Sequence, residues 1–144
     1  MNSRSFKVFH FCALALFLIT ACQEPTGPSK GSIEIACLGP TTVLESGAKF
    51  KAINNSEEVF WYYGYEDTLP IYTREIESDT GWVEDMVGWC GVGLTKYEFE
   101  PQRYFEFEAH GPIEEHGAWR VGIWFYFDED SQDHEIFWSE KVLP

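Results

Sequence analysis

Residues 118–127 read Ala-Trp-Arg-Val-Gly-Ile-Trp-Phe-Tyr-Phe, and this run predicts the strongest β-strand of the chain. Aromatic and β-branched side chains of this kind are enriched in strands. Two other segments, 47–54 and 103–109, alternate apolar and polar residues with the period of two that a half-buried strand requires. We therefore expect Phe50 of the first segment and Phe105 of the second to face a core.

Further short segments of this character follow one another along the chain, separated by turn residues: 57–65, 71–76, 81–84, 97–100 and 135–142. Helical periodicity is nearly absent. Strands that recur at spacings of about ten residues are typical of an antiparallel, immunoglobulin-like β-sandwich, here of about seven or eight strands. A closed barrel is the weaker alternative, because the strands are short and irregularly spaced.

The N-terminus has the order of a secretory signal peptide. Arg4 and Lys7 precede the mostly apolar run 8–19, and small residues then lead to Cys22. The final residues resemble a bacterial lipoprotein signal, in which the cysteine is lipidated and becomes the new N-terminus. An ordinary cleaved signal, a membrane anchor and a buried core helix are the alternatives, but the apolar run is short for a membrane span.

This pattern divides the chain into three parts. Residues 1–21 are predicted to be a lipoprotein signal peptide, and 22–32 the lipidated N-terminus with a flexible tether rich in Pro, Gly and Ser. Residues 33–144 are predicted to be the β-sandwich domain. We expect the protein in the bacterial cell envelope, attached by palmitate and the other acyl chains of a lipoprotein, and in the outer membrane if the envelope has one.

The charge of the chain excludes some partners. It carries 24 acidic and 10 basic residues, for a formal net charge of −14. Nucleic acid is disfavoured because its phosphates require Lys and Arg. An anionic membrane surface is disfavoured as a direct ligand for the same reason, so the lipid would anchor the protein. The many aromatic residues argue against disorder and allow a large core.

One loop motif carries a resemblance to a known group of proteins. The element Gly88-Trp89-Cys90-Gly91-Val92-Gly93 and the strands on either side of it resemble bacterial envelope proteins with immunoglobulin-like domains. The resemblance spans residues 47–142 and implies the sandwich fold, without an activity. In such domains the corner usually reads Pro-Gly, and here Pro101 is followed by Gln102. Small bacterial proteinase inhibitors of immunoglobulin-like fold are a more distant likeness, in architecture alone.

Two cysteines remain after the signal peptide and Cys22 are set aside. Cys37 and Cys90 form an even pair in a compartment where disulfides persist, so a bridge between them is predicted. Two buried free thiols are the alternative. Neither C-x-x-C nor H-x-x-H occurs, and no metal or other cofactor is expected.

Aromatic side chains offer a possible binding surface. Exposed Trp and Tyr rings recognise sugar rings and form hot spots on protein partners. The candidates lie on strands with aromatic residues on both faces, and they are Trp61, Tyr63, Tyr65, Trp124 and Tyr126. The alternative is that core and loops cover both faces.

Catalysis is not expected. The sequence holds no nucleophile elbow or Ser-His-Asp order, and its neighbouring carboxylates are numerous enough to occur by chance. The resulting hypothesis is a membrane-anchored, non-catalytic interaction module with an envelope or extracellular protein as its partner. A carbohydrate-binding module and a proteinase inhibitor, with a protruding loop at 88–94 or 111–117, are the alternatives.

Overall fold

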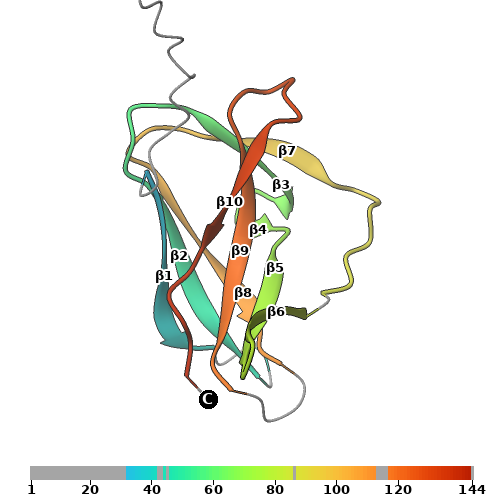
Figure 1. Cartoon of the computed structure of the whole chain (residues 1–144). Coiled ribbons are helices and arrows are strands. Elements are labelled where there is room, and N and C mark those ends of the chain that lie inside the picture. The colour runs from blue at the N-terminus through green and yellow to red at the C-terminus, as the bar shows by residue number, and fades with distance from the viewer. Residues whose placement is uncertain (1–31, 42–43, 45, 86, 113–116, 144) are drawn as a thin grey trace, which may run out of the picture.

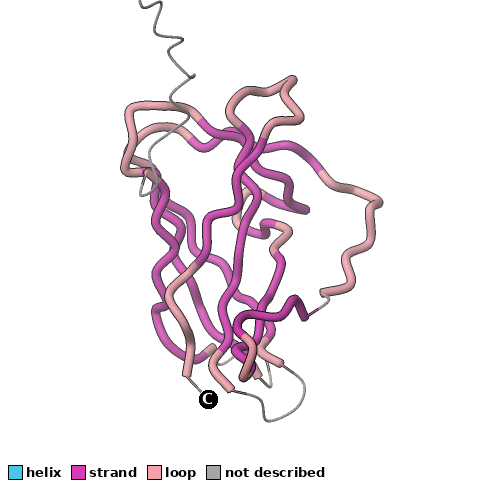
Figure 2. The backbone as a smooth tube through the Cα atoms, viewed as in Figure 1, coloured by secondary structure: helices cyan, strands magenta, loops and turns pink. Residues whose placement is uncertain are grey.

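The computed structural model describes residues 32–41, 44, 46–85, 87–112 and 117–143. This part of the chain is all β: ten strands form antiparallel sheets, without a helix and without closure into a barrel (Figures 1 and 2). The strands are β1 (Ile33–Pro40), β2 (Gly47–Asn54), β3 (Phe60–Glu66), β4 (Leu69–Pro70), β5 (Thr73–Ser78), β6 (Gly81–Asp85), β7 (Thr95–Phe99), β8 (Tyr104–His110), β9 (Trp119–Tyr126) and β10 (His134–Trp138).

The smaller sheet has the strand order β1-β2-β8. Strand β2 is the central strand, because it pairs with β1 on one side and with β8 on the other. Its apolar residues at every second position (Ala48, Phe50, Ala52) face the other sheet and are buried. Phe50 lies opposite Phe107 of β8, and the two rings stack with centroids 5.5 Å apart. The predicted alternation of 47–54 and 103–109 is confirmed.

The larger sheet has seven strands, and β9 connects most of them. Strand β9 pairs with β10, with β5 and, through Tyr126 opposite Trp61, with β3. Strand β3 also pairs with β4 and with β7, and β5 also pairs with β6. The β5–β6 hairpin extends this sheet.

The core lies between the two sheets. Its side chains come from the inner faces of nearly all the longer strands and are mostly aromatic, as in Phe60, Tyr62 and Phe125. Tyr62 contacts Phe105 across the sheets, with ring centroids 4.7 Å apart. A large aromatic core of this kind supplies most of the apolar burial that a small domain requires.

A buried asparagine joins two turns at one end of the sandwich. Asn54 is 0% exposed, and its Nδ2 donates to the Glu58 carbonyl (2.8 Å) and the Phe99 carbonyl (3.0 Å). Its Oδ1 accepts from the Ser56 N–H (3.0 Å) and from the Ser56 hydroxyl (2.7 Å). The turn predicted from this Asn and Ser chemistry therefore also anchors the end of β7.

The corner between β7 and β8 is a type II turn. Pro101 is its first central residue, Gln102 follows with φ 60°, and the Arg103 N–H donates to the Glu100 carbonyl at 3.3 Å. Gln102 thus adopts the left-handed conformation that a glycine would take without steric cost.

Two strands lie outside the sequence expectation of about seven or eight. Strand β1 begins with alternating Ile33 and Ile35, which are both buried, and it bulges between Cys37 and Gly39. Strand β4 has two residues and pairs with the end of β3, so no sequence period marks it.

The predicted bridge between Cys37 and Cys90 is wrong for this structure, since both thiols are free. Cys37 lies on β1 at the outer edge of the smaller sheet, and Cys90 lies on the loop between β6 and β7, which projects from the opposite side of the molecule (Figure 1). An even number of cysteines in a sequence gives no information about the distance between their thiols in the fold. The signal peptide, the proposed lipid site Cys22 and the predicted tether up to residue 31 lie outside the described residues. Ser32, the last residue of the predicted tether, is buried, and its carbonyl accepts from the Asn55 N–H at 2.8 Å.

Candidate functional site

The five predicted binding residues lie on the outer face of the larger sheet. Trp61, Tyr63 and Tyr65 alternate along β3 with the buried Phe60 and Tyr62, and Trp124 and Tyr126 alternate along β9 with the buried Ile123 and Phe125. All five are half-buried. They are thus not part of the core between the sheets, and four of them form what we call the outer aromatic patch: Trp61, Tyr63, Trp124 and Tyr126.

Cross-strand neighbours hold the outer aromatic patch together. Trp61 lies directly opposite Tyr126, and Tyr63 meets Tyr126 edge to face, with centroids 5.4 Å apart and planes at 88°. Lys96 of β7 places its Nζ 4.6 Å from the Tyr126 ring centroid. Burial raises the pKa of Tyr126, and Tyr63 raises it further. The patch therefore combines aromatic rings with one cation.

Tyr65 lies apart from this patch. Its hydroxyl donates to the Cys90 carbonyl, and its ring centroid is 6.1 Å from that of Trp89. Its role is to hold the loop that follows β6. The sequence placed it with the other aromatics because it shares their alternation along β3.

A second aromatic group on the same face was missed from sequence. The Arg120 guanidinium lies between two tryptophan rings, 4.3 Å from the Trp82 centroid and 4.5 Å from the Trp138 centroid. The Glu75 carboxylate accepts from Arg120 Nε (2.8 Å) and Nη2 (2.6 Å). These side chains come from β5, β6, β9 and β10, so only the strand pairing brings them together.

Gly122 gives the Trp138 ring its place. A Cβ at Gly122 would lie 2.8 Å from Trp138 Cε3 and 2.7 Å from Ile136 Cγ2. The absence of a side chain thus lets the ring lie against the backbone of β9 and reach Arg120.

The glycine-rich motif at residues 88–93 lies in the projecting loop between β6 and β7 (Figure 1). Trp89 anchors it: its indole Nε1 donates to the Tyr72 carbonyl at 2.6 Å, and its ring stands edge to face against Tyr72 with centroids 4.8 Å apart. Beyond this anchor, Val92 is 81% exposed. Trp89 therefore holds the base of the loop in place, and the loop exposes the apolar side chain of Val92 to solvent.

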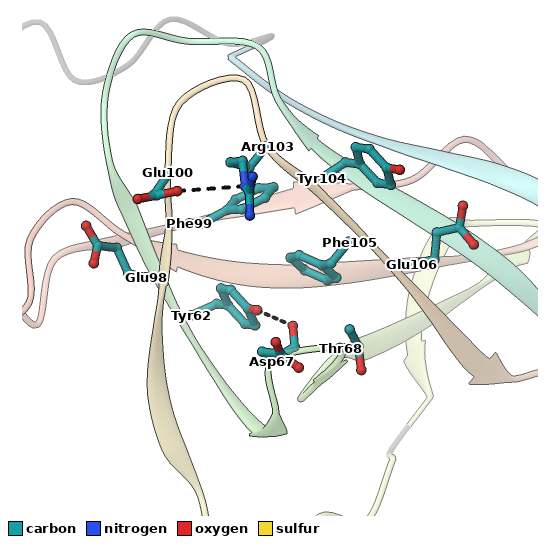
Figure 3. A pocket seen from close by; sticks show the side chains of 10 residues that line it. All are labelled: Tyr62, Asp67, Thr68, Glu98, Phe99, Glu100, Arg103, Tyr104, Phe105 and Glu106. Carbon is teal, nitrogen blue, oxygen red and sulfur yellow. Dashed lines mark hydrogen bonds and ion pairs between the residues drawn. The ribbon is translucent and has the colours of Figure 1, made fainter.

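A cavity of about 630 Å³ opens where the two sheets part, between β7, β8 and the turn after β3 (Figure 3). Buried rings of Tyr62, Phe99 and Phe105 form its inner wall, and carboxylates stand around it. The Tyr62 hydroxyl donates to the Asp67 carbonyl, and burial, followed by the Asp67 charge, raises the Tyr62 pKa. The sequence did not single out this site.

The acidic loop between β9 and β10 is held by a local turn. Asp128 of the acidic loop accepts from the N–H groups of Asp130 (3.0 Å) and Ser131 (2.6 Å), which is an Asx turn. In the part of the chain that the structure describes, no three His, Cys, Asp or Glu side chains are grouped to hold a metal ion. The loop 113–116, which includes His116, lies outside the described residues.

No helix of the described ranges is both long and apolar enough to cross a membrane. Comparison of the chain with protein-family models, with curated proteins and with solved structures found no match.

Proposed function

We propose that this chain is a lipid-anchored protein of the bacterial envelope whose β-sandwich is a non-catalytic module that binds another envelope or extracellular protein. The observation that carries the proposal is the outer aromatic patch, in which Trp61, Tyr63, Trp124 and Tyr126 lie half-buried on one face of the larger sheet. Clustered Trp and Tyr are the residues that most often supply binding energy at protein interfaces.

The anchor rests on the signal-like N-terminus and on Cys22 at its end. Several acyl chains on one cysteine hold a protein stably at a membrane, whereas one chain does so only marginally. Replacing Cys22 by serine should move the protein from the membrane fraction to the soluble fraction and abolish palmitate labelling. Retention in the membrane would contradict the lipid anchor.

A protein partner is favoured over a carbohydrate by the geometry of the rings. Sugar-binding platforms present rings in one plane, but Tyr63 and Tyr126 stand at 88° to each other. Lys96, whose Nζ also donates to the carbonyls of Asp128 and Ser131, and Arg120, paired with Glu75, add polar groups to the face. Such a mixture of rings and polar groups suits an uneven protein surface.

Proteinase inhibition is the second candidate, and the loop between β6 and β7 favours it. Inhibition by a sandwich requires a protruding loop with a stable base, and here Trp89 holds the base while Val92 is 81% exposed. Stoichiometric inhibition of an elastase-like enzyme that is lost on Val92→Asp would support it. Full residual protease activity across several classes would exclude it.

The main test is mild crosslinking of the full-length protein in its own envelope, followed by purification of the adduct. The wild type is compared with the double variant Trp61→Ala/Trp124→Ala and with Leu38→Ala, which removes an apolar side chain 49% exposed on the smaller sheet. We expect one saturable protein adduct that the double variant loses and Leu38→Ala keeps. The same adduct in all three, or none at all, would refute the role of the patch.

A separate measurement addresses sugars. Tryptophan fluorescence of the wild type should not change across a panel of envelope glycans. A saturable change that the Trp61→Ala/Trp124→Ala variant lacks would assign the patch to carbohydrate instead.

A further inference from the structure

The smaller sheet ends in an edge strand beside the cavity. Among the strands that the structure describes, β8 pairs with β2 alone. The backbone carbonyl of Arg103, just before β8, points toward β2 and accepts from the Asn54 N–H at 3.0 Å. The His110 N–H, at the end of β8, points away from β2 and donates to the Tyr72 hydroxyl at 2.9 Å. Because backbone groups alternate in direction along a strand, the odd-numbered residues face β2 and the even-numbered ones face the open edge. The residues whose N–H and C=O face the open edge are Tyr104, Glu106 and Glu108.

The cavity adjoins this edge. Tyr104, Phe105 and Glu106 of β8 line one side of it, and β7 and the turn after β3 line the other (Figure 3). A strand added to β8 would alternate its side chains between two environments. One set would point inward, to the aromatic wall of Tyr62 and Phe105. The other set would point outward, beside Glu106 and Glu108.

The charges select the side chains of such a strand. The cavity lining carries four carboxylates (Asp67, Glu98, Glu100, Glu106) against one cation, Arg103. Glu106 is paired with Lys49 at 2.6 Å, and Arg103 lies 3.7 Å from Glu100. Asp67 takes part in no ion pair within the described residues, whereas Glu98 lies directly opposite Trp61, on the outer face of the larger sheet. A cation entering from the open side would therefore find the Asp67 carboxylate without a competing partner.

We propose that this edge binds an extended, basic segment of a partner protein by strand addition to β8. Apolar side chains of the segment enter the cavity, alternate Lys or Arg side chains lie beside Glu106 and Glu108, and the segment passes near Asp67, which lines the cavity. A second copy of this chain is not the occupant, because antiparallel pairing of two β8 strands would set glutamates opposite glutamates. The site shares no residue with the outer aromatic patch, so each can fail without the other.

The test uses the full-length protein in detergent and the synthetic peptide acetyl-Lys-Val-Lys-Val-Lys-Val-Lys-amide. Titration calorimetry measures binding, and hydrogen exchange measures protection of the segment 103–109. We expect saturable binding with slower exchange in this segment. A peptide with Glu in place of each Lys, and a peptide with its lysines and valines in separate blocks, should not bind.

Backbone pairing is tested on the peptide, which leaves the protein intact. Two peptides are N-methylated, one at every valine and one at every lysine. Since only one set of N–H groups faces β8, one of these peptides should lose at least tenfold in affinity and the other should keep it. Equal effects of the two, or no effect of either, would overturn strand addition.

Protein variants test the remaining steps. Glu106→Pro removes an N–H at the open edge, where proline is tolerated, and should weaken binding more than Glu106→Gln, which removes only the charge. Asp67→Asn/Glu108→Gln should weaken binding about fivefold, whereas Glu140→Gln, in the segment after β10, should not. Binding that ignores these variants, or that leaves exchange in 103–109 unchanged, would refute the proposed site.

Discussion

Replacing Asn54 by alanine should be among the most destabilising single changes in this protein. The side chain is fully buried and uses all four of its hydrogen-bonding positions. The bond to the Phe99 carbonyl is itself buried, so alanine removes a hydrogen bond from the interior of the protein, which costs about 1–3 kcal/mol. Loss of the bonds to Glu58 and Ser56 adds about 1 kcal/mol. We therefore expect the free energy of unfolding to fall by about 2–4 kcal/mol.

The assay is urea unfolding followed by tryptophan fluorescence, in which a pure stability change shifts the midpoint and leaves the slope unchanged. Asn55→Ala is the matched control, because Asn55 lies in the same turn and, within the described residues, its side chain makes one hydrogen bond, an exposed one to Glu34 at 3.3 Å. This control should lose less than about 0.5 kcal/mol. A loss below about 1 kcal/mol for Asn54→Ala would refute the reasoning, since it would mean that water or a shifted backbone satisfies the Phe99 carbonyl.

Asn54→Asp sharpens the same test. A carboxylate could still accept from Ser56, but it cannot donate to the carbonyls of Glu58 and Phe99. At neutral pH this variant should be at least as unstable as Asn54→Ala. It should recover part of the difference at acidic pH, where a protonated aspartate has a donor again. An equal loss of unfolding free energy at neutral and at acidic pH would show that the two bonds donated by Asn54 contribute little.

Four further predictions concern single residues. Gln102→Gly should raise the free energy of unfolding by about 0.5–1 kcal/mol, measured by urea midpoint, since φ 60° is costly for a side chain and the lost bond to Ser56 is exposed. Gly122→Ala should cost about 1–3 kcal/mol, because its Cβ would lie 2.8 Å from a Trp138 ring carbon, and a silent substitution would contradict the packing described. Burial raises the pKa of Tyr62 above its ordinary 10.0, so the stability it contributes is complete below that pH and is lost as the pH rises further; Tyr62→Phe should flatten the alkaline limb of a pH–stability curve. Cys90 is an exposed free thiol and should react with a thiol reagent in the native state, while reductant should leave the unfolding midpoint of the protein unchanged.

The period of the side chains decided the strands. Strand β2 begins and ends as expected from sequence, at Gly47 and Asn54, because alternation of small and aromatic residues with lysines admits no other period. The same reasoning assigned Phe105 to the core, which the structure confirms. It placed Trp61 and Tyr63 together on one face of their strand, and the structure shows that this face is the outer one. Local patterning specifies which residues of a strand share a face, and here it was sufficient to predict the alternation of burial along β2 and β8.

What lies across from each face was decided only by the tertiary structure. Arg120 meets Trp82 and Trp138 because β5, β6, β9 and β10 are neighbours in one sheet, a relation that no sequence spacing contains. The cavity beside β8 and the separation of Cys37 from Cys90 have the same origin. Alternation along one strand is a short-range property of the backbone, whereas the pairing of strands and the gap between sheets arise from packing of the whole core. The sequence by itself therefore determined the strands and their faces, and the fold decided which of those faces meet, which stay open and which acids stand around an unfilled space.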